Sequence, residues 1–140
     1  MSVYLDASVL LPTIVDEPSS AAVERFLTSV DDGLIISEFA AAEVASGMSR
    51  LVRTRLIDSD VATRRLSIFD AWRANETQAI DIEGSDVRAA SAIVRRFELM
   101  LRAPDALHVA VCRRLDARLA TFDLRLAEVA EKLGVNVVSI

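Results

Sequence analysis

The 140-residue sequence predicts an α/β fold, with a five-stranded parallel sheet between two layers of helices. Five short β-like segments alternate with longer segments whose apolar residues recur at helical spacing, and this alternation is typical of βαβ units. Glycine and proline are rare, at 4 and 3 residues, and no linker or repeat divides the chain. We therefore expect a single three-layer α/β/α domain over residues 1–140.

The first half of the chain begins with a strand, VYL at residues 3–5. A helix opens near Pro18, and its apolar residues are Val23, Phe26, Leu27 and Val30. After a second strand, LII at 34–36, Ser37 is a natural N-cap for a long helix, and Ser59 can cap another. Two helices therefore separate the second strand from the third.

The second half of the chain follows the same pattern. A strand is expected at 78–82, a helix capped by Ser85 comes next, and Pro104 fits the first turn of a further helix. The strand RLAT at 118–121 precedes a helix that stops at Gly134, and VNVVSI forms a last strand at the end of the chain. The apolar stripe expected on the helix after Ser85 is Val87, Ala90, Val94, Phe97 and Leu101.

Composition and charge exclude several classes of protein. No segment approaches the roughly 18 successive apolar residues of a membrane helix, and no basic stretch leads into an apolar one at the N-terminus, so neither a membrane span nor a secretory signal is expected. The single cysteine, Cys112, cannot form an intramolecular disulfide, which favours a cytoplasmic setting. A net charge of −5 argues against broad electrostatic binding to nucleic acid.

Four carboxylates occupy positions that the expected fold brings together. Asp6 ends the first strand and Asp123 follows the fourth, and ligands of open parallel sheets bind beyond the carboxyl ends of the strands. Asp105 lies in the first turn of the helix that leads into the fourth strand, so its helix starts at the same edge. Glu43, with small neighbours, is expected on the inward face of its helix.

Each acid also has a purely structural interpretation. Asp123 can cap the next helix, Asp105 gains from the positive end of its own helix, and Glu43 can face solvent.

Converging carboxylates would repel one another and raise their pKa values unless a divalent cation holds them. Oxygen ligands favour Mg²⁺ or Mn²⁺, and there is no set of cysteines and histidines of the kind that binds zinc. We expect His108 to pack or hydrogen-bond near the pocket, and Cys112 to lie in the core.

Taken together, these motifs resemble the PIN domain, and specifically the VapC-type toxin ribonucleases of type II toxin–antitoxin systems. The matching stretches span nearly the full chain: Asp6-Ala7-Ser8, Glu43 in the helix after Ser37, Asp105-Ala106-Leu107-His108 and Thr121-Phe122-Asp123. The resemblance implies Mg²⁺- or Mn²⁺-dependent cleavage of RNA by a metal-activated water, and it implies which residues carry it. These are the catalytic metal ligands Asp6, Glu43, Asp105 and Asp123, supported by the hydroxyls of Ser8 and Thr121. The pair Ala103-Pro104 is less usual in the family.

The resemblance also implies partners. Such toxins usually form homodimers, and a small cognate antitoxin wraps the dimer and occludes the acidic pocket. Arg102, next to the expected site, is the first candidate for a phosphate contact, although a solvated arginine is the default. Apolar residues of the middle helices could contact a partner or belong to the core: Leu51, Val52, Leu56, Ile57 and Trp72.

Other functions are open at this point. A housekeeping RNA-processing nuclease, or a non-catalytic PIN module that binds RNA or protein, would share the fold. An aspartyl phosphatase needs an aspartate where Ser8 stands. A receiver domain needs an acidic pair after the first strand, where Leu5 precedes Asp6, and a well-placed lysine, but Lys132 is the only lysine. The glycine motifs of dinucleotide-binding and P-loop proteins are missing.

Overall fold

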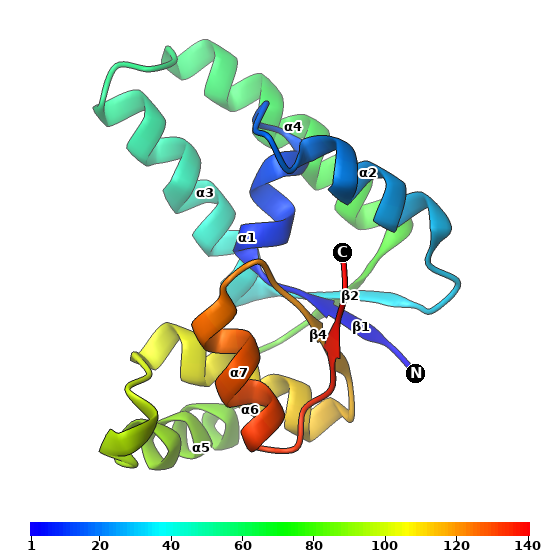
Figure 1. The fold of residues 1–140 in the computed structure, drawn as a ribbon. Helices are drawn as coiled ribbons and strands as arrows, with labels where there is room; N and C mark the ends of the chain where they lie inside the picture. The colour runs from blue at the N-terminus through cyan, green and yellow to red at the C-terminus, as the bar shows by residue number, and fades with distance from the viewer.

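The computed structural model describes residues 1–140 and contains a single sheet of five parallel strands (Figure 1). The strands are β1 (Val3–Leu5), β2 (Leu34–Ser37), β3 (Gln78–Ile80), β4 (Arg118–Ala120) and β5 (Val137–Val138). Their order in the sheet is β3-β2-β1-β4-β5. Because the chain proceeds from β1 to one side and later returns to the other, the order of the strands reverses between β1 and β4, where ligands of such sheets bind.

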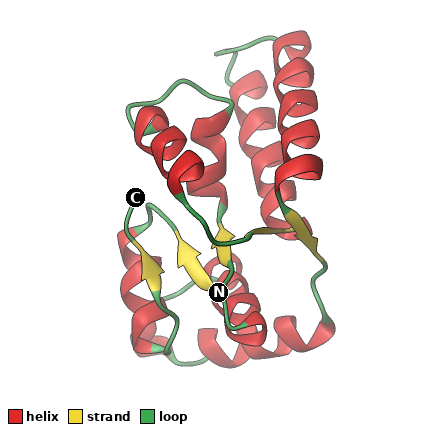
Figure 2. Cartoon of the chain, turned by 90° about the vertical axis from the view of Figure 1, so that its right-hand side faces the viewer, coloured by secondary structure: helices red, strands yellow, loops and turns green.

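Helices cover both faces of the sheet, which confirms the expected three layers (Figures 1 and 2). One face is covered by α1 (Ala7–Leu10), the 3₁₀ helix η1 (Leu11–Thr13), α2 (Ser20–Ser29), α3 (Glu38–Arg53) and α4 (Ser59–Glu76). The other is covered by α5 (Gly84–Val94), the 3₁₀ helix η2 (Phe97–Leu99), α6 (Ala103–Leu115) and α7 (Leu124–Lys132).

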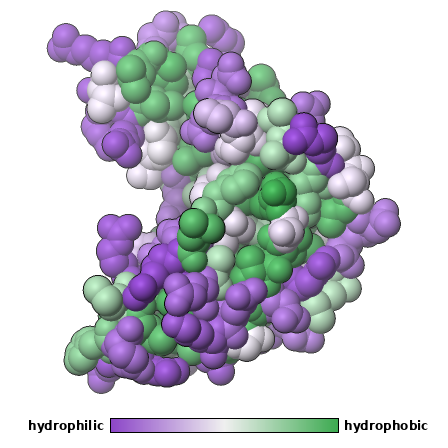
Figure 3. Space-filling view, in the orientation of Figure 1, coloured by the Kyte–Doolittle hydropathy of each residue, from purple (hydrophilic) through white to green (hydrophobic).

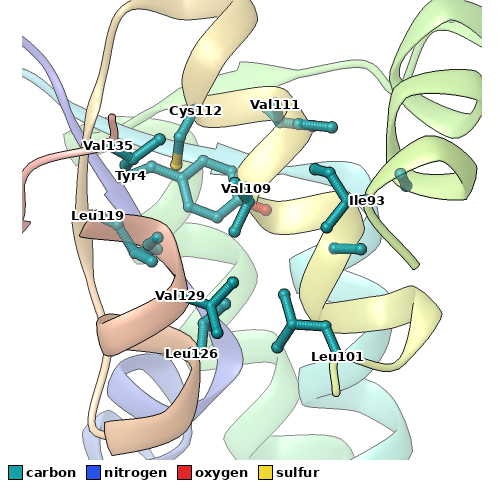
Figure 4. Packing of buried hydrophobic residues seen from close by; sticks show 14 of the residues in the cluster. Tyr4, Ile93, Leu101, Val109, Val111, Cys112, Leu119, Leu126, Val129 and Val135 are labelled. Carbon is teal, nitrogen blue, oxygen red and sulfur yellow. The ribbon is translucent and has the colours of Figure 1, made fainter. Parts of the chain in front are cut away.

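Two hydrophobic cores lie on the two faces because strand side chains alternate in direction. The strand residues that pack with α5, α6 and α7 are Tyr4, Ile35 and Leu119. Those that pack with α1 to α4 are Val3, Leu5, Ile36 and Ala120. Figure 4 shows the first core, where the ring of Tyr4 lies beside Cys112 and Val109 of α6. Cys112 is fully buried, so its assignment to the core is confirmed.

Several predicted helix boundaries are confirmed. Ser37 caps α3, since its hydroxyl oxygen accepts the Ala40 N–H at 2.9 Å. Pro104 lies in the first turn of α6. Gly134 follows the end of α7 with a φ of 85°, a left-handed conformation that glycine adopts without strain.

Two other caps were assigned wrongly, by one and two residues. The N-cap of α4 is Asp58, not Ser59, and its carboxylate accepts the Val61 N–H at 2.8 Å. The N-cap of α5 is Glu83, not Ser85. A carboxylate lies one residue before the serine in the first case and two residues before it in the second, and carboxylates also suit the positive end of a helix.

The prediction of one helix with an apolar stripe from Val87 to Leu101 is also wrong, because α5 ends at Val94. Phe97 lies in η2 with 79% of its surface exposed, and Met100 has a left-handed φ of 54°. The backbone leaves the helical conformation at Arg96, with a ψ of 80°, and again at Met100, so α6 starts anew at Ala103.

Strand ends and the segment after β1 also differ from expectation. β3, β4 and β5 are shorter than predicted, and Thr121 lies just beyond β4. Residues 7–13 form α1 and η1, which were not predicted. None of the helices combines the length and the apolar character required to cross a membrane.

Candidate active site

Asp6 lies directly after β1 and is buried, with only 4% of its surface exposed. The Ser8 hydroxyl donates to one carboxylate oxygen at 2.6 Å and the Thr121 hydroxyl to the other at 2.5 Å. The Val9 N–H also reaches the carboxylate, at 3.3 Å, so Asp6 caps α1. Burial raises the pKa of Asp6 above its usual range, and the Ser8 and Thr121 bonds work against that rise. Hydroxyl and amide donors thus take the place of a cationic partner.

The same two hydroxyls hold the loop that carries Asp123. The Ser8 oxygen accepts the Phe122 N–H at 2.9 Å, and the Thr121 oxygen accepts the Asp123 N–H at 3.0 Å. The end of β1 and the β4–α7 loop are therefore joined side chain to backbone. Both hydroxyls contact the carboxylate of Asp6, as expected, while their part in catalysis stays a prediction.

Asp123 is exposed and caps α7. One of its carboxylate oxygens accepts the Leu126 N–H at 3.0 Å, which confirms the structural interpretation of this residue. Its other oxygen accepts no hydrogen bond and remains available. A capping role and a ligand role therefore use different oxygens of the same side chain.

Glu43 points toward α6 from the second turn of α3. Its Oε1 is 2.5 Å from Nε2 of His108, and 31% of its side chain is exposed. The alternative of a fully solvated outer face is therefore wrong, and the expected hydrogen bonding of His108 is confirmed. Oε2 of Glu43 accepts no hydrogen bond.

Asp105 lies half-buried in the first turn of α6 and accepts no hydrogen bond. Burial raises its pKa above the usual aspartate range, and the negative charges of Asp123 and Glu43 raise it further. Arg102, exposed at the N-cap position of α6, counteracts part of this rise. Carboxylates on α3, on α6 and in the β4–α7 loop therefore act on one another across a common region.

These acids fit a hard divalent cation in donor type more clearly than in spacing. All four offer oxygen, which Mg²⁺ and Mn²⁺ prefer, and a cation would relieve the repulsion felt by Asp105. However, no three His, Cys, Asp or Glu side chains are grouped closely enough to hold a metal ion. The acids surround the region without forming a compact ligand cluster. Figure 3 shows a hollow in the surface between α3 and the segment that contains η2 and the start of α6.

Two site features escaped the sequence analysis. Tyr4, expected only as a buried strand residue, places its hydroxyl 2.6 Å from Nδ1 of His108 and 2.7 Å from the Ser37 hydroxyl. A tyrosine in a fully buried strand needs a partner for its hydroxyl, and this was the available signal. The second feature is a cavity of about 730 Å³ that none of the four carboxylates lines. It lies between η1, α2 and α4, with Phe69 and Trp72 in its wall.

The apolar residues considered for partner contacts are not fully buried. Leu56 is 72% exposed, whereas the other four are partly buried: Leu51, Val52, Ile57 and Trp72. Trp72 packs beside Phe69, with the ring centroids 6.2 Å apart. Ordinary core packing therefore accounts for Trp72 in part and for Leu56 not at all.

Comparison with known proteins identifies the family of the chain. Residues 3–132 match the model of the PIN domain family. Ribonuclease VapC46 of Mycobacterium tuberculosis is 30% identical over 141 residues, covering 99% of this chain and 97% of the relative.

Solved structures with the same fold include three that cover most of both chains. VapC20 of Mycobacterium tuberculosis, a sarcin–ricin-loop-cleaving toxin, is 16% identical, with a TM-score of 0.73 over 97% of this chain and 98% of that chain. DNA-bound VapBC of Salmonella typhimurium is 16% identical, with a TM-score of 0.71 over 99% and 97%. A toxin–antitoxin complex from Klebsiella pneumoniae is 17% identical, with a TM-score of 0.63 over 85% and 84%. The chain therefore belongs to the PIN domain family and, within it, to the VapC ribonuclease toxins.

Proposed function

We propose that this chain is a Mg²⁺- or Mn²⁺-dependent endoribonuclease whose metal ligands are Asp6, Glu43, Asp105 and Asp123. The observation that carries the proposal is the half-buried carboxylate of Asp105, whose pKa is raised by burial and raised further by the negative charges of Asp123 and Glu43. Repulsion of this kind costs stability, so the arrangement favours a cationic ligand over a purely structural role. This speaks against the non-catalytic alternative.

The surroundings of each acid suggest its role in binding the metal ion. Asp6, held by Ser8 and Thr121, is the fixed member, and Glu43 is held by His108. Asp105 and Asp123 keep free oxygens and would move toward a bound ion. A Mg²⁺ or Mn²⁺ ion bound there would neutralise phosphate charge and activate the attacking water. No protein nucleophile is then required.

Arg102 is the side chain that we assign to a substrate phosphate. It is exposed, it makes no capping bond, and its charge already acts on Asp105. A planar guanidinium suits two-point contact with phosphate oxygens.

We further propose that the chain acts in the cytoplasm as a homodimer, as the toxin of a toxin–antitoxin pair, with residues 1–140 forming one domain. The likeness to the Klebsiella pneumoniae complex supports an antitoxin partner. Co-expression with the product of an adjacent small reading frame should suppress toxicity. A chain that is never toxic and has no such neighbour would instead be a housekeeping nuclease.

The proposal is tested by incubating the purified chain with labelled RNA in Mg²⁺ and in EDTA. Cleavage should require Mg²⁺ and fall at least about 100-fold in Asp6→Asn, which removes a ligand charge from the buried site. Asp31→Asn, which changes an exposed acid without hydrogen bonds, should cleave normally. Binding of RNA without cleavage, or cleavage that survives Asp6→Asn, would contradict it.

A further inference from the structure

A chain of side-chain hydrogen bonds connects both ends of the first half of α3. It starts at Ser37, the N-cap of α3, whose hydroxyl is 2.7 Å from that of Tyr4 in β1. The Tyr4 hydroxyl is 2.6 Å from Nδ1 of His108 in α6, and Nε2 of His108 is 2.5 Å from Glu43. Glu43 is thereby tied to the start of its own helix through residues from two other elements.

The chemistry of the groups sets the direction of these bonds. An ionised carboxylate only accepts hydrogen bonds, so Nε2 of His108 must carry the proton that faces Glu43. In a neutral ring Nδ1 then accepts the hydrogen of Tyr4, and the Tyr4 oxygen accepts that of Ser37. The Ser37 oxygen finally accepts the Ala40 N–H at 2.9 Å. Every member of the chain is thus satisfied.

The ring of His108 is bonded at both nitrogens and lies beside two other aromatic rings. Its side chain is 3% exposed, and the ring centroids of Tyr4 and Phe39 each lie 5.5 Å from its own. Tyr4 and Ser37 are completely buried. Glu43, by contrast, is partly exposed, at 31% of its side chain. A glutamate side chain loses conformational entropy when it is fixed in one position.

We propose that Tyr4 and His108 are positioning residues that hold Oε1 of Glu43 and leave Oε2 free for the divalent ion. The inference rests on the proposed function, because it takes Glu43 as a ligand. Hydrogen-bond partners of metal ligands typically contribute about 10- to 100-fold in affinity or activity. We expect the same range here, although Tyr4 touches neither the ion nor the substrate.

The hydrogen-bond chain can be tested without metal or RNA, because His108 is the only histidine. In ¹⁵N NMR spectra of the metal-free protein, a single imidazole signal set should show a proton on Nε2. Tyr4→Phe keeps the packed ring but removes the hydroxyl that donates to Nδ1. The Nδ1 resonance should therefore shift toward that of a ring nitrogen that accepts no hydrogen bond. A ring without a proton on Nε2, or an Nδ1 signal that ignores Tyr4→Phe, would overturn the assignment.

The functional part is tested by Mn²⁺ titration calorimetry on four proteins: wild type, Tyr4→Phe, Glu43→Gln and the double variant. Tyr4→Phe should weaken Mn²⁺ binding by about 10-fold or more in the wild-type background. It should have no further effect in Glu43→Gln, because it acts only through Glu43. Equal effects in both backgrounds would mean that Tyr4 contributes only to general stability and would overturn the proposal.

A matched control separates positioning from loss of stability. Phe69→Leu alters the other core and should destabilise the fold while leaving Mn²⁺ affinity unchanged. If wild type binds no Mn²⁺ and cuts no RNA, the proposed function fails and takes this inference with it. If wild type binds Mn²⁺ and Tyr4→Phe binds it equally well, only this inference fails.

Discussion

The hydroxyl of Thr121 donates to the carboxylate of Asp6 across 2.5 Å, although 115 positions separate the two residues in the sequence. The same hydroxyl oxygen accepts the Asp123 N–H at 3.0 Å. One small side chain thus joins the ends of the two central strands, β1 and β4, to the loop that carries a second acid. The stability of the buried Asp6 therefore depends on Thr121.

Replacing Thr121 by valine should destabilise the protein by about 1–3 kcal/mol, because a buried carboxylate oxygen and a backbone N–H lose their partner without a change in side-chain shape. Urea unfolding monitored by circular dichroism measures this. Thr121→Ser keeps the hydroxyl and should lie much closer to wild type. A Thr121→Val protein as stable as wild type would show that the bond contributes nothing.

Asp105→Asn should stabilise the metal-free protein at neutral pH while removing activity. Burial and the charges of Asp123 and Glu43 raise the pKa of Asp105 in the folded state. The stability linked to the protonated Asp105 side chain is therefore fully present at pH values below its unfolded pKa. It is lost as the pH rises through the folded pKa. The gain at about pH 7 should be a few tenths of a kcal/mol to about 1 kcal/mol.

Unfolding experiments in EDTA at several pH values test this sign. The difference in free energy of unfolding between Asp105→Asn and wild type should shrink as the pH falls toward about 3, where both side chains are neutral. Asp31→Asn provides the exposed control and should show no such trend. A variant less stable than wild type at neutral pH would mean that Asp105 is not under net repulsion.

Arg114→Met should destabilise the fold by about 3 kcal/mol by leaving the Asp86 carboxylate without its partner. Asp86 is 2% exposed, and Arg114 contacts both of its oxygens, at 2.8 and 2.9 Å, which joins α6 to α5. Burial opposes the effect, but the Arg114 bonds hold the pKa of Asp86 below its usual range.

Because the pKa of Asp86 is lower in the folded state, this carboxylate stabilises the fold at pH values above its unfolded pKa. That stability is lost as the pH falls through the folded pKa. The free energy of unfolding should therefore fall less steeply with decreasing pH in Arg114→Met than in wild type. Lys132→Met, which breaks only the exposed pair with Glu128, should flatten the profile far less, because solvent screens this pair. Identical acid profiles for Arg114→Met and wild type would contradict this account of Asp86.

Divalent ions should stabilise the folded chain, because a ligand that binds only the folded state adds about 2.7 kcal/mol at 100 times its Kd. Thermal unfolding with Mg²⁺, with Mn²⁺ and with EDTA measures the effect. Asp123→Asn should lose most of it while keeping the α7 cap, since asparagine caps helices equally well. An equal Mn²⁺ shift in Asp123→Asn would remove Asp123 from the ligand set.

Alternation of strands and helices was enough to predict the parallel sheet and the edge at which the acids gather, because chain direction alone puts β-strand ends and the start of α6 on one side. The contact between His108 and Glu43 could not be predicted in the same way. It depends on the rotation of α6 against α3 and on side-chain rotamers, which periodicity does not encode. The break after Val94 was missed because apolar spacing continues across it by chance, and Pro104 marked only the start of α6.

The most direct test is the anomalous difference map of crystals of this chain grown with Mn²⁺. We expect a peak bounded by oxygens of Asp6, Glu43, Asp105 and Asp123, with Glu43 still bonded to His108. A peak elsewhere, or none at saturating Mn²⁺, would contradict it.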